Sequence, residues 1–242
     1  MAPMSTYLLI HGAWHGGWCY HKLVPLLEAE GHTVLAPDLP GHGDDKTPTV
    51  SVTLRSYANR ICQIANEQPE PVILLGHSMG GVAITEAAEQ CAEKIAALVY
   101  LSAFLPRNGD SLMAWSRQDP TSLVNSNIVP LEEGVVGMKP EAVRDAFYQH
   151  CSDEDAAYAQ SRLVPQAIAP LVELVTTSAS RWGQIPRYYI ECGDDHALTL
   201  PLQRAMQRVS PCKQTFSINT DHSPFLSAPE ELARILMEIR NA

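Results

Sequence analysis

Short apolar runs alternate along this chain with segments of helical periodicity, and this alternation constrains its fold more than any other feature. Near-continuous apolar runs are typical of strands buried inside a parallel sheet, and parallel strands need a crossover connection that is usually a helix. We therefore predict an α/β fold with a mainly parallel six-stranded sheet flanked by helices. Strands are expected at 7–10, 33–36, 71–75, 95–102, 187–191 and 214–218, and helices at 18–30, 53–68, 79–90, 201–209 and 229–240.

The alternation stops between residues 105 and 182. We expect no strand in this stretch, only helices around 140–150, 153–162 and 170–178. An insertion between two late strands of an open α/β sheet comes to lie over the carboxyl edge of the sheet, where ligands bind. The prediction is one domain, 1–242, with a helical cap at roughly 105–182 inserted between two late strands.

The composition excludes several classes of function. A chain of 242 residues that is 45% hydrophobic and 18% charged has enough apolar residues for one folded core. Its net charge of −10 argues against a nucleic-acid partner, because phosphate contacts need a basic face. No apolar stretch approaches the roughly 20 residues of a membrane helix, and Met1 to Met4 do not resemble a secretion signal. We expect a cytoplasmic protein with no membrane partner.

Six cysteines are scattered through the chain without close pairs or metal-ligand spacing. In a cytoplasmic protein such cysteines are expected to be buried, reduced thiols. They are Cys19, Cys62, Cys91, Cys151, Cys192 and Cys212.

The segment 76–81 reads Gly-His-Ser-Met-Gly-Gly and lies between an apolar run and a helix. A G-x-S-x-G pattern in this context predicts a sharp strand-to-helix turn that holds its serine in a strained, exposed conformation. Small residues are needed two positions on either side of that serine, because the backbone leaves no room for a Cβ atom. Ser78 is therefore the candidate nucleophile; an ordinary glycine-rich turn is the alternative.

A serine hydroxyl needs a neighbouring base to remove its proton, and nine histidines are available. With this nucleophile turn the chain order is nucleophile, acid and then histidine, so the base should lie late in the sequence. Only His196 and His222 follow the resumed strands. We favour His222, in the loop 219–225 after the last strand, because His196 adjoins the expected acid and could not easily reach Ser78 as well.

The acid of such a triad orients the imidazole and stabilises its charged form. Asp194 and Asp195 follow the expected strand 187–191, and their spacing alone does not choose between them. Asp110 and Asp119 are weaker candidates after the fourth strand. Asp221, beside His222, is expected to bind local backbone amides instead.

An oxyanion hole should complete the site. One donor is expected to be the amide of Met79, directly after the nucleophile, and the other the amide of Ala13 in the glycine-rich turn 11–17. His11 and His15 lie four apart in this turn, but zinc usually binds such a pair on a helix with further ligands. We interpret them as structural histidines and expect no metal.

These residues together resemble the α/β-hydrolase superfamily. The turn 11–18 (His-Gly-Ala-Trp-His-Gly-Gly-Trp), the segment 76–81 and the Asp-His pair ending at His222 are similar to the plant methylesterase and hydroxynitrile lyase branch and to small bacterial carboxylesterases. The similarity extends to 37–43, 102–106 and 147–155. In that family the triad acid lies three residues beyond a cysteine or threonine that ends the penultimate strand. Carried onto Cys192, this implies Asp195.

The resemblance also bears on the reaction. The lyases of this branch carry a threonine after the first-turn histidine and a lysine after the catalytic histidine, to handle the cyanohydrin hydroxyl and the departing cyanide. Here these positions are Gly12 and Ser223, so lyase chemistry loses its electrostatic basis. A serine nucleophile also sets the chain apart from relatives that use a nucleophilic aspartate on epoxides or haloalkanes.

The expected function is therefore that of a serine carboxylesterase (EC 3.1.1), which forms an acyl-enzyme on Ser78 and needs no cofactor. Its substrate is expected to be a small, mostly neutral aryl or alkyl ester, and the family resemblance implies that methyl esters are among these. A homodimer is left as an open alternative. Alternatives are a hydroxynitrile lyase or acyltransferase on the same fold, or a receptor-like hydrolase that binds a ligand without turnover. The residues expected to contact substrate are Gly12, Phe104, Trp115, Leu123, Phe147 and Leu198.

Overall fold

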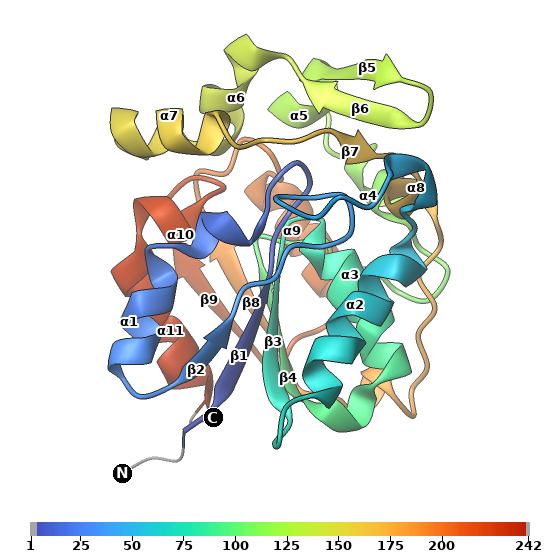
Figure 1. Cartoon of the computed structure of the whole chain (residues 1–242), viewed down its shortest axis with the longest axis vertical. Coiled ribbons are helices and arrows are strands. Elements are labelled where there is room, and N and C mark those ends of the chain that lie inside the picture. The colour runs from blue at the N-terminus through green and yellow to red at the C-terminus, as the bar shows by residue number, and fades with distance from the viewer. Residues whose placement is uncertain (1–3, 241–242) are drawn as a thin grey trace.

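A six-stranded, wholly parallel sheet forms the centre of the molecule (Figure 1). The computed structural model describes residues 4–240; the first three residues of the segment compared with a secretion signal lie outside this range. The strand order is β2-β1-β3-β4-β8-β9. The strands are β1 (Thr6–Ile10), β2 (Thr33–Leu35), β3 (Val72–His77), β4 (Ile95–Leu101), β8 (Arg187–Cys192) and β9 (Gln214–Ile218). The predicted α/β architecture is confirmed.

Helices cover both faces of this sheet, as its apolar strands require. Helices α1 (Leu23–Ala29) and α11 (Pro229–Arg240) pack together on one side, and α2 (Leu54–Asn66) and α3 (Gly80–Gln90) on the other (Figure 1). Helix α2 begins with a capping box, in which Thr53 and Ser56 bind each other's backbone amides. Helices α9 (Leu200–Val209) and α10 (Pro224–Ser227) complete the body, with short 3₁₀ turns at Gly17–Tyr20, Thr49–Ser51, Ala92–Lys94 and Trp182–Gln184.

The strand order reverses between β1 and β3, and this switch point fixes the site. From β1 the chain crosses outward to β2 and then returns to β3 on the other side of β1. The register pairs Ile10 with Gly76, so the turn after β1 lies beside the turn after β3. In open α/β sheets, ligands bind at this point, outside the carboxyl ends of the strands.

The cap between β4 and β8 corrects two sequence predictions. Its expected lack of strands was wrong, because β5 (Ile128–Glu132), β6 (Val135–Met138) and β7 (Gln166–Ala167) form a small antiparallel sheet above the body (Figure 1). The helix expected at 170–178 is a single turn, α8 (Ala169–Val172), after which the chain is irregular. The other cap helices are α4 (Leu112–Ser116), α5 (Leu123–Asn127), α6 (Pro140–Phe147) and α7 (Asp153–Gln160).

The cysteines also differ from expectation. Cys62 on α2 and Cys91 at the end of α3 form a disulfide, although they lie 29 residues apart. The packing of α2 against α3 brings them together, which spacing along the chain could not show. Cys19, Cys151 and Cys192 are buried free thiols, as predicted, and Cys212 is a free thiol that is only partly buried. In the part of the chain that is described, 4–240, no helix has the length and apolar character needed to cross a bilayer.

Candidate active site

The turn after β3 holds Ser78 in a conformation that few residues other than glycine adopt. Its φ is +53°, in the left-handed region. A Cβ atom on Gly76 would come within 2.5 Å of the Gly80 carbonyl oxygen, and one on Gly80 within 2.7 Å of the Ile10 carbonyl oxygen. The two glycines therefore let strand, turn and helix approach closely, and Ser78 is left at the carboxyl edge facing a cavity.

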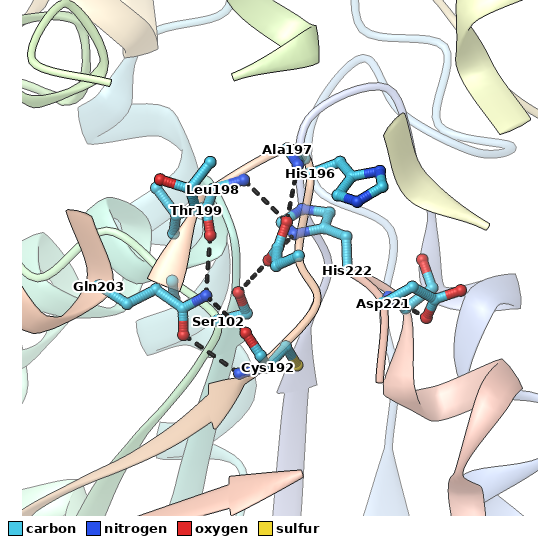
Figure 2. A network of polar contacts seen from close by, with 12 residues as sticks. Ser102, Cys192, His196, Ala197, Leu198, Thr199, Gln203, Asp221 and His222 are labelled. Carbon is cyan, nitrogen blue, oxygen red and sulfur yellow. Dashed lines mark hydrogen bonds and ion pairs between the residues drawn. The ribbon is translucent and has the colours of Figure 1, made fainter. Parts of the chain in front are cut away.

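A buried carboxylate–imidazole pair lies at the same edge (Figure 2). His222 Nδ1 lies 2.6 Å from Asp195 Oδ2, and both side chains are almost fully buried. The other oxygen of Asp195 accepts the amides of Ala197 at 2.7 Å and Leu198 at 2.8 Å. Because the carboxylate accepts from Nδ1, the proton of a neutral His222 belongs on Nδ1 and Nε2 is left as the basic nitrogen.

The loop that carries His222 is tied to the residue directly before Ser78. His77 Nε2 donates a hydrogen bond of 2.8 Å to the His222 carbonyl oxygen, and the two rings lie 4.5 Å apart. Burial and the neighbouring His222 hold the pKa of His77 well below its usual range, so that it stays neutral. The ring of Phe147, which lines the same cavity as Ser78, lies 5.7 Å from the His222 ring. These contacts place the loop that carries His222 next to the turn that carries Ser78.

The turn after β1 supplies backbone amides beside Ser78. Ala13 and Met79 both line the cavity with Ser78. Among the described residues, the hydrogen bonds of this region leave the amides of Ala13 and Met79 without a protein acceptor. Two such donors next to a serine hydroxyl have the arrangement of an oxyanion hole.

Two histidines fix the shape of this turn. His11 Nε2 accepts the Leu39 amide at 3.0 Å. His15 Nδ1 contacts the Ala13 carbonyl oxygen at 2.7 Å, and its Nε2 contacts the Tyr148 hydroxyl at 2.7 Å. Burial lowers the pKa of His15 to about 4 and that of His11 well below its usual range. The structural interpretation of both is thus supported, and within 4–240 no cluster of three or more histidines, cysteines and carboxylates could hold a metal ion.

The cavity beside Ser78 has mostly apolar walls. Among the described residues that line it, none is charged. Phe104, Phe147 and Leu198, which were expected to contact substrate, are among the residues that line it. The remaining walls come from Trp14, Leu112, Met113, Ser116, Val124, Ile128, Leu171 and Ala197.

Comparison with known proteins identifies the family. Residues 7–235 match the model of the alpha/beta hydrolase family. The chain belongs to this family. "Putative methylesterase 15, chloroplastic" of Arabidopsis thaliana is 33% identical over 253 residues, which cover 98% of this chain and 57% of the relative. The chain thus spans little more than half of that relative's length.

Two further comparisons cover both chains almost completely. Methylesterase 7 of Arabidopsis thaliana is 32% identical, and the match covers 97% of this chain and 96% of the relative. A crystal structure of a pyrethroid hydrolase from Sphingobium faniae JZ-2 superposes with a TM-score of 0.90 at 32% identity, covering 99% of this chain and 98% of that one. The resemblance to methylesterases stated from the sequence is confirmed.

Three residues predicted to contact substrate do not line the cavity of this alpha/beta hydrolase. Trp115 is buried, and its indole N–H donates to Asp110 at 3.0 Å. Leu123 packs onto the core, and its neighbour Val124 faces the cavity instead. Gly12 lies against Ser78, since a Cβ atom there would meet the Ser78 Cβ at 2.9 Å. For Trp115 and Leu123 the cause is that the orientation of the short cap helices α4 and α5 could not be derived from the sequence.

The competing carboxylates of the hydrolase have other partners. Asp194 is half-exposed and accepts from His150 Nε2 at 2.6 Å, and His150 and His196 lower its pKa, His150 more strongly. Asp221 accepts the nearby amide of Ser223, as expected, and also the amide of His150 in the cap. Asp119 accepts from the amide and hydroxyl of Thr199. His196 contacts the Asp145 carbonyl oxygen and is also half-exposed.

Ser102 is the site residue that the sequence reasoning missed. It follows β4, is fully buried, and its hydroxyl donates a short hydrogen bond to Asp195 Oδ2 (Figure 2). Its φ is +38°, also in the left-handed region. The signal in the sequence was a serine at the carboxyl end of the central apolar run 95–102, one strand away from the nucleophile turn.

Proposed function

We propose that this alpha/beta hydrolase is a serine carboxylesterase in which Ser78 is the nucleophile, His222 the base and Asp195 the acid. The observation that best supports this proposal is the buried His222–Asp195 pair at 2.6 Å, set beside the strained turn of Ser78. The names of its relatives, two methylesterases and a pyrethroid hydrolase, support an ester as substrate.

The proposed reaction follows from the arrangement of these groups. Ser78 Oγ attacks the ester carbonyl carbon while His222 Nε2 takes its proton. Asp195 accepts the hydrogen bond from His222 Nδ1, which keeps the ring in this orientation, and it stabilises the imidazolium that forms. The amides of Ala13 and Met79 bind the negative oxygen of the tetrahedral intermediate. His222 then protonates the leaving alcohol, and water repeats the sequence to release the acid.

The cavity favours small, neutral substrates. Its described walls carry no charge that could pair with a charged acyl or alcohol group, and burying an unpaired charge is costly. We therefore propose aryl or alkyl esters, methyl esters among them. The cytoplasmic location and the homodimer predicted from the sequence remain predictions, and the Cys62–Cys91 disulfide argues against a reducing compartment.

Hydrolysis of p-nitrophenyl acetate by the parent enzyme and by Ser78→Ala tests the proposal. Ser78→Ala is expected to lower kcat by about 10⁴-fold or more, because it removes the proposed nucleophile that forms the acyl-enzyme. The matched control is Ser116→Ala, which removes the other serine lining the cavity and is expected to keep kcat within about 3-fold.

The outcomes distinguish the alternatives. Saturable ligand binding with no Ser78-dependent turnover would favour a receptor and refute the proposal. Ester products formed with added methanol in preference to free acid would favour an acyltransferase. Undiminished hydrolysis by Ser78→Ala would reject Ser78 as nucleophile.

A further inference from the structure

A second apolar groove lies on the cap, next to the catalytic cavity. Its walls come from the β5–β6 hairpin, the first turns of α6 and the segment 163–165, and include Met138, Val143, Leu163 and Val164. Figure 1 shows these elements together above the body of the molecule. Few polar side chains are found among the described residues that line the groove, so the groove suits an alkyl chain better than a charged ligand.

Trp14 is the one described residue that lines both this groove and the catalytic cavity. It directly follows Ala13, whose amide is a proposed oxyanion donor. Its side chain is 6% exposed. Trp14 therefore lies between the space around Ser78 and the groove beyond it.

Several contacts hold this wall in place. The indole N–H donates to the Val136 carbonyl oxygen at 3.1 Å, and the ring lies 6.0 Å from that of Phe147. On the backbone, the Trp14 carbonyl oxygen accepts the Val164 amide at 2.9 Å, and the Trp14 amide contacts Gln166 Oε1 at 3.4 Å. Its φ is +63°, a conformation that is unfavourable for an aromatic residue unless its surroundings enforce it.

We propose that Trp14 sets the longest alkyl chain that the enzyme accepts, by closing the catalytic cavity against the cap groove. This inference rests on the proposed ester hydrolysis and adds a determinant of its substrate range. An ester whose chain is longer than the cavity meets the indole. If the indole is removed, cavity and groove become continuous, and the groove takes the far end of the chain.

Chain-length profiles of Trp14→Ala test the inference. Hydrolysis of p-nitrophenyl butyrate and octanoate varies the acyl chain, and hydrolysis of butyl and octyl acetate varies the alcohol chain. In one of these two series, the long-to-short ratio of kcat/KM should rise about 30-fold or more over the parent enzyme, since each newly buried methylene contributes about 3- to 4-fold. An unchanged ratio in both series would overturn the inference, as would a parent enzyme that already prefers the octyl chain.

Three variants make the result specific. Met113→Ala enlarges the same cavity through α4, away from the groove, and should not reproduce the shift. Val164→Phe in the Trp14→Ala background refills the groove and should restore the parent ratio. Trp14→Gly covers the case in which Trp14→Ala does not fold, because glycine adopts a positive φ without strain. An equal shift in Met113→Ala would contradict a role specific to Trp14.

A binding measurement separates this inference from the proposed function. In the Ser78→Ala background, calorimetry compares the affinities for 1-butanol and 1-octanol with and without Trp14→Ala. A selective gain for 1-octanol of about 30-fold supports the inference even if the parent enzyme hydrolyses no ester. Equal gains for both alcohols, or no gain, would overturn it even if hydrolysis through Ser78 is established.

Discussion

The body and the cap of this molecule contribute different things to the proposed site. The body supplies the polar groups: Ser78 after β3, Ser102 after β4, Asp195 after β8 and His222 after β9. The cap supplies apolar walls, such as Met113 and Phe147. Ser102, Asp195 and His222 are fixed by burial and hydrogen bonds and Ser78 by the backbone of its turn, whereas the cap walls are short helices and a small sheet.

Under the proposed function, this difference predicts where chemistry and selectivity are determined. Groups at the carboxyl ends of parallel strands are held by the whole hydrogen-bonded sheet, so their geometry tolerates little variation. Side chains of short cap helices can be exchanged without breaking the ladder of the sheet. Substitutions in the body should therefore change kcat most, and substitutions in the cap should mostly change the range of substrates.

The largest expected effect comes from the acid in the body. Asp195→Asn should lower kcat by about 10⁴-fold, because an amide at this place favours the wrong tautomer of His222. The matched control is Asp194→Asn, whose half-exposed side chain contacts His150 at the edge of the cap; it should change kcat by less than about 3-fold. Steady-state kinetics on p-nitrophenyl acetate decide between them. If the two substitutions had equal effects, the assignment of Asp195 would be wrong.

The second effect concerns stability alone. The Cys62–Cys91 disulfide joins α2 to the end of α3, within the body and away from the cavity. The double substitution Cys62→Ala and Cys91→Ala should lower the free energy of unfolding by about 3 kcal/mol, since it frees a loop of about 30 residues in the unfolded chain. Urea unfolding measures this, and kcat/KM should remain unchanged. If the double variant were fully folded but had lost most of its activity, the expectation that this disulfide affects stability alone would be wrong.

Ser102 offers a smaller test, since it acts on the reacting groups through Asp195. Ser102→Ala removes a hydrogen bond to a buried carboxylate and should lower kcat by about 10-fold. Without this donor, the Asp195 carboxylate should stabilise the positively charged form of His222 more strongly. The acid limb of the pH profile of kcat should therefore move to higher pH. Ser223→Ala is the control, because among the described residues its buried hydroxyl has no hydrogen-bond partner. A lower kcat without a shifted profile would indicate a purely structural role.

The smallest effect tests a contact between the two regions, His15 in the body with Tyr148 from the cap. The pKa of His15 is lowered to about 4 by burial. Between the usual histidine value near pH 6.5 and about 4, the unfolded chain binds a proton that the folded chain does not, so stability falls as the pH falls. His15→Gln should reduce this slope by at most about 1.4 kcal/mol per pH unit, the value for one full proton. Urea unfolding at pH 7, 6 and 5 measures it, and an unchanged slope would contradict the assignment.

How far the sequence predicts the molecule also differs between body and cap. The strands of the body read as apolar runs and the nucleophile turn as a fixed spacing, so the sheet and the positions of Ser78 and His222 followed from local pattern. The choice of Asp195 needed the family resemblance, because spacing left Asp194 equally suitable. The β5–β6 hairpin was missed because Val129 to Leu131 is short, interrupted by Pro130 and half-exposed, and so carries weak strand periodicity.

Contacts between distant segments were beyond the reach of spacing. The Cys62–Cys91 bond depends on how α2 packs on α3. The hydrogen bond from Ser102 to Asp195 joins two residues 93 positions apart, which follow β4 and β8. Trp115 and Leu123 were expected in the pocket because they are large and apolar. In the structure, the short helices that carry them orient both side chains toward the core.

The most direct test of the central claim is mass spectrometry of the enzyme after reaction with diisopropyl fluorophosphate. The reagent phosphorylates a serine that a neighbouring base has activated. The account predicts one adduct, on Ser78, formed in proportion to the loss of esterase activity and absent from His222→Ala. Full inactivation with Ser78 unmodified, or an adduct that forms equally fast in His222→Ala, would contradict it.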